Sequence, residues 1–129
     1  MRRPDGDLLS RLDREQNVWL CTLRADGSPH LTPVWFVYRP DSLWFCVGER
    51  TVKVRNLARD PRVSLALEDG LAPAVAEGSA RRHTGDSPEE IVAAFLGKYD
   101  WDIRKPLEIG GFGVLYEVPV TRWLLAGAA

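Results

Sequence analysis

The pattern of apolar and turn residues in the first half of the chain predicts a meander of β-strands. Val18–Leu23 is an apolar run that ends at an Asp-Gly pair at positions 26–27, and this pair favours the positive φ of a tight hairpin. The return strand is expected over His30–Tyr38. A turn that contains Pro40 then leads to a third strand over Leu43–Val47.

The second half of the chain continues this strand-rich pattern. A fourth strand is predicted over Arg62–Glu68 and a fifth over Ala72–His83, with an Asp-Gly turn between them. The apolar residues from Phe112 to Leu125 predict either one long strand or two strands joined at Pro119. No repeat or linker interrupts the pattern, so residues 1–129 are expected to form a single domain.

Three segments have the apolar spacing or the end signals of helices. A leucine stripe predicts a helix over Asp7–Gln16 that packs across a sheet. A short basic helix is predicted over Thr51–Arg59, between two of the strands. The third helix is expected to have Ser87 as its cap and Pro88 at its first position, and to end within residues 97–100.

The second and third predicted strands are apolar on both faces. A sheet with one solvated face alternates between apolar and polar residues, so this pattern indicates a closed barrel whose outer wall is covered. The cover can be helices or another subunit, and we expect a dimer. The residues that carry this argument are Leu31, Val34, Trp35, Phe36, Val37, Tyr38, Leu43, Trp44, Phe45 and Val47.

The composition is that of an ordinary globular domain and contributes mainly exclusions. Hydrophobic residues make up 45% and charged residues 27% of the 129 residues, so a disordered chain is not expected. The formal net charge of -1 gives no overall field that would hold nucleic acid or an anionic membrane, so anion binding requires a local cluster. There is no apolar run of about 18 residues and no signal peptide at the start, so we expect a cytoplasmic protein.

The motifs of several enzyme classes are missing from the sequence. The chain has no glycine-rich dinucleotide or phosphate loop, no zinc-binding motif and no serine-hydrolase motif. Cys21 and Cys46 lie in apolar runs, where buried small residues are expected rather than a metal site, a disulfide or a reactive thiol. No residue can be assigned as a catalytic acid, base or nucleophile. If the protein is an enzyme, a cofactor is expected to carry the reaction.

The basic helix is the main positive signal for binding. Arg50 and Lys53 stand at its first turn, where the helix dipole is already positive, and Arg55 follows. An anion at this end would resolve the conflict, because free backbone N–H groups, the Thr51 hydroxyl and these cations together form a phosphate cradle. The alternative is that the cations are a solvated helix face. Composition and spacing leave both interpretations open.

Three segments of the sequence resemble a known family: Thr32-Pro-Val-Trp-Phe-Val, Leu43-Trp-Phe-Cys-Val and Lys53-Val-Arg-Asn-Leu-Ala-Arg-Asp-Pro-Arg-Val-Ser-Leu. They are similar to the pyridoxamine 5'-phosphate oxidase-like split-barrel superfamily. More narrowly, they resemble its actinobacterial branch of flavin/deazaflavin oxidoreductases, which use coenzyme F420 or, in some members, FMN. The segments Ala74–Ala80 and Tyr99–Asp102 are similar to that branch as well, so the resemblance spans roughly residues 8 to 126.

The resemblance implies a mainly β fold of the α+β class, a six-stranded split β-barrel that binds FMN-type cofactors and carries peripheral helices. It also implies a homodimer with two cofactor sites at its interface. Lys53 would contact the cofactor phosphate, helped by Arg50 or Thr51 and by Arg55, and Trp101 could lie over the partner's site. The residues that would line the flavin or deazaflavin ring are His30, Thr32, Pro33, Val34 and Trp35.

The resemblance further implies an oxidoreductase, and the preferred function is a reductase that depends on reduced coenzyme F420. It would transfer a hydride from C5 of the deazaflavin to a small enone, quinone or tetrapyrrole-like acceptor. The alternatives are an FMN-dependent oxidase or reductase of the same fold and a non-catalytic flavin, haem or tetrapyrrole-binding protein. Residues 120–129 lack the substrate-phosphate motif of the vitamin-forming oxidase, which argues against pyridoxal phosphate synthesis.

The two histidines and the tryptophans have structural alternatives. His30 stands where a ring would be met, and it is either a proton donor or an edge-strand histidine bonded to backbone or water. Arg81, Arg82 and His83 either end a strand in solvent or receive the anionic oligoglutamate tail of the deazaflavin. Most of the tryptophans are expected in the core, with Trp35 and Trp101 as the candidates for stacking on a ligand.

Overall fold

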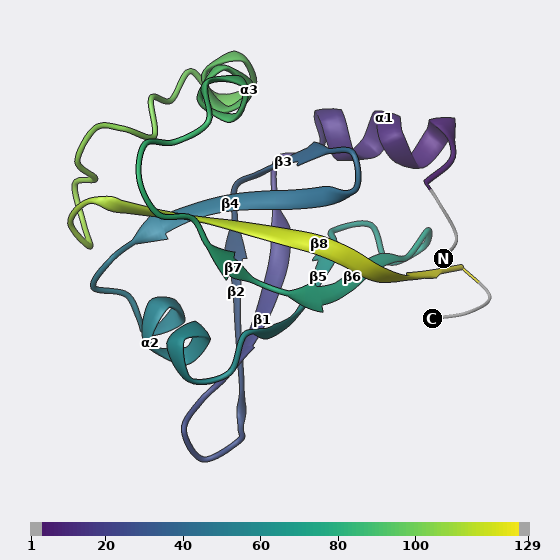
Figure 1. The fold of residues 1–129 in the computed structure, drawn as a ribbon. Coiled ribbons are helices and arrows are strands. Elements are labelled where there is room, and N and C mark those ends of the chain that lie inside the picture. The colour runs from purple at the N-terminus through teal and green to yellow at the C-terminus, as the bar shows by residue number, and fades with distance from the viewer. Residues whose placement is uncertain (1–3, 127–129) are drawn as a thin grey trace.

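The eight strands within residues 4–126 form one antiparallel sheet in the order β2-β1-β5-β6-β8-β4-β3, and β7 pairs with β8 outside this order (Figure 1). The structure is a computed structural model that describes these residues. The helices are α1 (Gly6–Arg14), α2 (Val52–Arg59) and α3 (Glu89–Tyr99). The strands are β1 (Val18–Leu23), β2 (Pro29–Val34), β3 (Phe36–Arg39), β4 (Ser42–Gly48), β5 (Arg62–Leu67), β6 (Ala74–Ser79), β7 (Arg81–Arg82) and β8 (Gly113–Leu125). None of the helices in this part of the chain is long and apolar enough to cross a membrane.

Strand β8 makes the sheet curl, because its two halves pair with different strands. Its first half pairs with β4, from Gly113 to Pro119, and its second half pairs with β6. The register shifts at Gly78, where a Cβ would collide with the carbonyl oxygen of Pro119. The sheet therefore bends into a half-barrel, which confirms the expected split-barrel fold. Of the two alternatives for the C-terminal segment, the structure has the one long strand.

Two strands that the sequence predicts as continuous are each divided in the structure. The strand expected over His30–Tyr38 is broken at Trp35 into β2 and β3, and the one expected over Ala72–His83 is broken at Ala80 into β6 and β7. The two halves of the first pair with different strands, β2 with β1 and β3 with β4. The two halves of the second, β6 and β7, pair with different parts of β8. Because two of the six expected strands are each divided in two, the sheet has eight strand segments.

The expected helix ends need correction. Pro88, not Ser87, is the N-cap of α3, because its ψ of 134° is extended and places it outside the helix. Thr51 is likewise the cap of α2 rather than its first residue, and α1 ends at Arg14 instead of Gln16.

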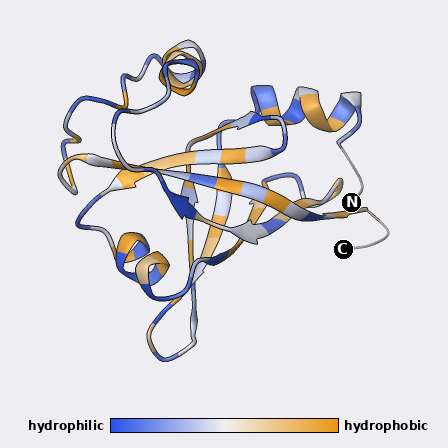
Figure 2. Ribbon diagram, in the orientation of Figure 1, coloured by the Kyte–Doolittle hydropathy of each residue, from blue (hydrophilic) through white to orange (hydrophobic). Residues whose placement is uncertain are grey.

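Strand β4 is buried on both faces, and each face belongs to a different cluster. Leu43 and Phe45 face the barrel core, whereas Trp44 and Cys46 face outward against α3. Figure 2 shows hydrophobic segments along β4 and β8. The helix α3 is therefore one cover of the outer wall, as the apolar pattern requires. Its contacts with that wall include Ile91, Val92 and Phe95.

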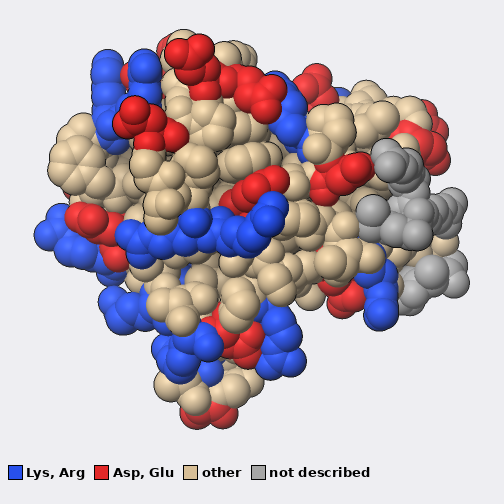
Figure 3. All heavy atoms as spheres, viewed as in Figure 1, with Lys and Arg blue, Asp and Glu red and all other residues tan. Residues whose placement is uncertain are grey.

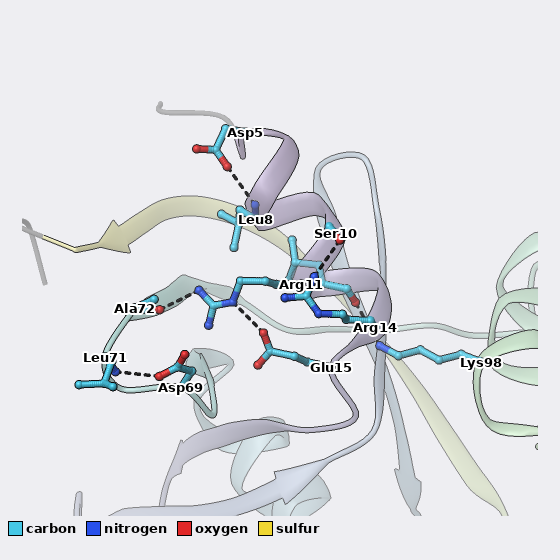
Figure 4. Close-up of polar contacts among 11 residues, drawn as sticks. Asp5, Leu8, Ser10, Arg11, Arg14, Glu15, Asp69, Leu71, Ala72 and Lys98 are labelled. Carbon is cyan, nitrogen blue, oxygen red and sulfur yellow. Dashed lines mark hydrogen bonds and ion pairs between the residues drawn. The ribbon is translucent and has the colours of Figure 1, made fainter.

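Helix α1 packs its buried Leu8 and Leu12 into the barrel core, and charged side chains add polar contacts near its end (Figure 4). Arg11 binds Glu15 at 2.7 Å through Nε and donates from Nη1 to the carbonyl oxygen of Ala72 at 2.7 Å. Lys98 reaches across from α3 and donates to the carbonyl oxygen of Leu12 at 3.1 Å. These bonds occupy carbonyl groups that helix and loop ends leave free.

An apolar row runs across the outer face of the other half of the sheet. The register places Pro33 opposite Trp19, Trp19 opposite Ala66, Ala66 opposite Val75, and Val75 opposite Leu124. Trp19 is 40% exposed in the single chain. Pro33 and Trp19 are the exposed members of this row, and the other three residues are half-buried in the single chain.

Candidate functional site

Helix α2 is fixed against the barrel by its buried side. Val54 and Leu57 enter the core, and Asn56 is only 2% exposed. The Asn56 Nδ2 donates to Thr22 Oγ1 on β1 at 3.0 Å, so the helix is bound to the sheet by a buried polar pair. This packing sets the rotation of α2 and decides which of its cations face the barrel.

The cations around α2 divide into two groups. Arg55, Arg59 and Arg62 are exposed, and Figure 3 shows Lys and Arg side chains over α2 and β7 with acidic side chains among them. Arg62 forms an ion pair with Asp60 at 2.7 Å. The solvated-face interpretation therefore describes these arginines.

Lys53 differs from its neighbours because it is half-buried. Within residues 4–126 it has no hydrogen bond or ion pair, and burial lowers its pKa from the usual 10.5. A cation that loses water without gaining a counterion is destabilising. An anion bound at Lys53 would remove this cost.

Two unpaired polar atoms accompany Lys53 on the neighbouring strand β2. His30 Nδ1 and Thr32 Oγ1 are buried and find no hydrogen-bond partner among the described residues. The pKa of His30 is lowered, first by burial and then by the positive charges of Arg24 and Lys53, so His30 lies within electrostatic reach of Lys53. Buried polar groups are rarely left unpaired, and these three point to a polar ligand.

A cavity of about 230 Å³ opens beside these groups. It is formed where β2 ends, β4 ends and α2 begins, and Trp101 closes it from the segment after α3. Larger cavities lie elsewhere, including one of about 380 Å³ beside Cys21 and Glu77, but the one cation in its lining, Arg62, is exposed and paired with Asp60. The lining residues of the smaller cavity are Pro33, Val34, Trp35, Cys46, Val47, Gly48, Thr51, Lys53 and Trp101.

Six of the ten residues expected to hold a cofactor line this cavity together: Pro33, Val34, Trp35, Thr51, Lys53 and Trp101. Thr51 already donates its hydroxyl to the carbonyl oxygen of Gly48 at 2.8 Å, which limits it to accepting further bonds. Trp101 stands beside Trp35 of its own chain.

The other four expected residues lie around the cavity rather than in its lining. His30 and Thr32 share the inward side of β2 with Val34, which is itself a lining residue. Arg50 is exposed and lies against Gly111, and Arg55 points its Nη1 at the carbonyl oxygen of Arg50, at 3.5 Å. The structure thus singles out Lys53 among the cations of the predicted cradle.

Three lining residues were not expected from the sequence. Gly48 is the last residue of β4 and approaches the loop backbone so closely that a Cβ would lie 2.8 Å from the carbonyl oxygen of Gly110. Burial raises the pKa of the Cys46 thiol to about 12, so it is a neutral wall of the cavity. Val47 adds a further apolar surface. In the sequence, the position of Gly48 between the predicted strand and the basic helix was the one signal of its close approach to the Gly110 backbone.

An aromatic cluster fixes Trp35 at the cavity. The Tyr99 ring stacks on the Trp35 indole with centroids 4.5 Å apart and planes 8° apart. Trp101 meets the same indole edge-on at 5.7 Å and 74°. Trp35 is 44% exposed, so the cluster presents a flat apolar surface to a ligand.

The basic segment at β7 forms a separate, shallow cavity of about 260 Å³. Arg81 pairs with Glu117 at 3.1 Å, and Arg82 is exposed. His83 lies against Trp44, and its Nε2 bonds with the carbonyl oxygen of Asp86 at 2.9 Å. Binding of an oligoglutamate tail here stays a prediction.

The sequence profile of the pyridoxamine 5'-phosphate oxidase family matches residues 6–117. The chain belongs to this family. Among solved structures, this family member is similar to the conserved hypothetical protein Rv2991 from Mycobacterium tuberculosis, with a TM-score of 0.73 and 25% identity, over 95% of this chain and 84% of that one. It is also similar to an F420 reductase, with a TM-score of 0.71 and 24% identity, over 94% and 98% of the two chains.

A haem-binding protein from Mycobacterium smegmatis has the same fold, with a TM-score of 0.69 and 25% identity. The match covers 99% of this chain and 56% of that protein, so the present chain corresponds to about half of it. The fold therefore occurs in proteins with different ligands. In residues 4–126, no group of three or more His, Cys, Asp or Glu side chains could hold a metal ion.

Proposed function

We propose that the cavity at the start of α2 binds a phosphate-bearing ring cofactor of the flavin type, and that the protein is a reductase dependent on coenzyme F420. The observation that carries this proposal is Lys53, a half-buried cation without a counterion, next to the unpaired polar atoms of His30 and Thr32. The residues present fit such a group, because they offer a charge for its phosphate and a flat surface for its ring.

Each part of the cavity has a role in this proposal. Lys53 would hold the phosphate by a charge-assisted hydrogen bond, supported by backbone N–H groups of the first turn of α2. His30 and Thr32 would bond the polar edge of the ring. Trp35 would stack on the ring, and the apolar Val34 would exclude water from it.

The bound deazaflavin would supply a hydride from C5 to an electron-poor double bond or polarised acceptor. The protein would contribute orientation, because stacking on Trp35 and anchoring at Lys53 fix both ends of the ligand. No side chain at the cavity has the position and partner of a general acid, so the proton is assigned to solvent.

FMN is the first alternative, because it presents the same phosphate and a ring of the same shape. A non-catalytic haem or tetrapyrrole-binding protein is the second. His30 is the observation that favours it, because a neutral imidazole nitrogen without a partner is a suitable metal ligand. The haem propionates could then meet Lys53.

We further propose that the active form is a homodimer. The cavity of one chain, about 230 Å³, is smaller than the roughly 300–1,000 Å³ of typical ligand pockets. Pro33 belongs both to the cavity and to the apolar row that leads through Trp19 to Leu124. A second copy seated on this row would bury the exposed apolar residues and add a wall to the site.

The test is a set of equilibrium titrations with FMN, riboflavin, coenzyme F420 and haemin, followed by protein fluorescence and ligand absorbance. Riboflavin lacks the phosphate of FMN, so we expect it to bind more weakly by about tenfold or more, the equivalent of a charge-assisted hydrogen bond. Equal affinity for FMN and riboflavin would contradict the phosphate site.

The same titrations separate the alternatives. Tighter binding of F420 than of FMN, with oxidation of the reduced deazaflavin by a panel of enones and quinones, supports the reductase. Binding without turnover supports a carrier or storage protein. A one-to-one shift of the haem absorbance that is lost in His30→Ala supports the haem alternative instead.

A further inference from the structure

Side chains of α3 bond the backbone N–H and carbonyl of Phe36, the first residue of β3, which pairs with β4. Strand β3 is the last in the strand order, and it begins at Phe36 directly after the break at Trp35. The Phe36 N–H donates to the Tyr99 hydroxyl at 2.9 Å, and the Phe36 carbonyl lies 2.9 Å from the same hydroxyl. Lys98 Nζ donates to this carbonyl at 3.1 Å. These bonds determine where the chain leaves Trp35.

The Tyr99 hydroxyl is a junction of three backbone groups. Besides the two groups of Phe36, it lies 2.8 Å from the carbonyl oxygen of Gln16, which precedes β1. A hydroxyl has one proton, so it donates to one of the two carbonyls at a time while accepting from the Phe36 N–H. Burial raises the pKa of Tyr99 to about 12, so this donor is retained at physiological pH.

The ring of Tyr99 acts on Trp35 directly. It covers one face of the indole in a near-parallel stack at 4.5 Å, while the exposed part of Trp35 lines the cavity. Trp101 holds the indole edge-on, and Phe95 in turn meets Trp101 at 5.5 Å and 81°. The indole plane is therefore set by residues of α3 and of the segment that follows it.

We propose that Tyr99 is a positioning residue, which fixes the Trp35 indole as the platform on which the ring of the ligand stacks. Its hydroxyl holds the backbone on one side of Trp35, and its ring holds the indole plane. The effect of Tyr99 on ligand binding rests on the proposed function, whereas its effect on the orientation of Trp35 can be measured in the ligand-free protein. The proposed function and the positioning role of Tyr99 can therefore fail separately.

The chain provides suitable contrasts for a test. Tyr99→Phe keeps the stacked ring and removes the backbone bonds, whereas Tyr99→Leu removes both. Tyr116 is buried in the barrel and stacks on Phe45 at 5.2 Å, away from the cavity lining. Tyr116→Phe is the matched control for deleting a hydroxyl.

The experiment is a double-mutant cycle with Trp35→Leu, read by the Kd for FMN. Tyr99→Leu should raise the Kd by about three- to tenfold in the wild-type background, since a lost aromatic stack has this effect. It should leave the Kd unchanged when Trp35 is already leucine. Tyr99→Phe should follow the same pattern with a smaller rise, and Tyr116→Phe should have no effect.

An equal loss of affinity in both Trp35 backgrounds would overturn the proposal, because Tyr99 would then act on the structure in general.

Near-UV circular dichroism of the ligand-free proteins is a second measurement. The signal that disappears in Trp35→Leu should also disappear in Tyr99→Leu, and its retention would overturn the proposal. If the wild-type protein binds neither FMN nor coenzyme F420, the proposed function fails while this second measurement still decides the role of Tyr99. If Tyr99→Leu does not fold, Tyr99→Phe carries the double-mutant cycle, and an equal rise of its Kd in both Trp35 backgrounds would overturn the proposal.

Discussion

Replacing Lys53 by methionine should weaken ligand binding and at the same time stabilise the ligand-free protein. Lys53 is half-buried, has no partner within residues 4–126, and has its pKa lowered by burial. Methionine has an unbranched, uncharged side chain that can occupy most of the space of the lysine side chain. The substitution therefore removes the cost of desolvating the ammonium group without leaving a large void. If Lys53 instead stabilised the folded protein, Lys53→Met would lower the free energy of unfolding.

The two effects have different sizes. A charge-assisted hydrogen bond to phosphate is worth about 1.5–3 kcal/mol, so the Kd should rise roughly 10- to 150-fold. The gain in stability is smaller, on the order of 0.5 kcal/mol, because Lys53 keeps part of its water and its charge is screened. Both numbers lie within the range of ordinary titrations.

The assay is a fluorescence titration with FMN, or with F420 if the wild-type protein binds it more tightly, together with urea unfolding of the ligand-free protein. Arg55→Met is the matched control, because Arg55 is exposed on the same helix and outside the cavity lining. It should change the Kd by less than about twofold. If Lys53→Met binds like the wild type, the phosphate does not lie at Lys53 and the reasoning fails.

Three further predictions concern the surroundings of the site. Thr22→Val should lower the free energy of unfolding by about 1–3 kcal/mol in urea, because it leaves the buried Asn56 amide without its acceptor, and Asn56→Leu added to it should recover part of the loss. Lys98 has its pKa lowered from 10.5 to about 8 by burial, so the unfolded chain binds more protons than the folded one in this range. Lys98 therefore contributes a rise in the free energy of unfolding from about pH 8 to 10, whereas Cys46 and Tyr99, whose pKa values burial raises to about 12, contribute a fall from about pH 9 upward. Lys98→Met, but not the exposed Lys105→Met, should remove the contribution of Lys98 and make the free energy of unfolding rise less, or fall more, between pH 8 and 10. Trp19→Arg should turn a dimer into a monomer in sedimentation experiments, and a wild-type protein that sediments as a monomer would contradict the dimer.

The sequence was sufficient for the strand-rich fold, and its charges indicated the start of α2 as a candidate site. Apolar runs separated by turn residues predicted the strands, and strands apolar on both faces predicted a covered barrel wall, part of which is covered by α3. The unfavourable position of Lys53 in the first turn of a helix singled out the start of α2. These are local properties, and local patterns of the sequence report them well.

The parts of the site that depend on distant contacts could not be predicted. Apolar residues continue without interruption through Trp35, and the break there accompanies bonds from Tyr99, which lies on another element. The spacing of charges did not separate Lys53 from Arg55 either. The rotation of α2 decides this, because Val54 and Leu57 turn inward, and residues two positions apart on a helix face different directions.

The most direct test of the phosphate site is the pKa of His30, measured by NMR titration with and without ligand. The chain has two histidines, so His83, at the separate basic cavity, is an internal reference. In the free protein, the pKa of His30 should lie below the ordinary 6.5, because of burial and the charges of Arg24 and Lys53. The phosphate of FMN bound at Lys53 neutralises one of these charges and should raise the pKa of His30, while His83 should stay unchanged because FMN has no oligoglutamate tail. A ligand that binds without moving the His30 titration would contradict the site at the start of α2.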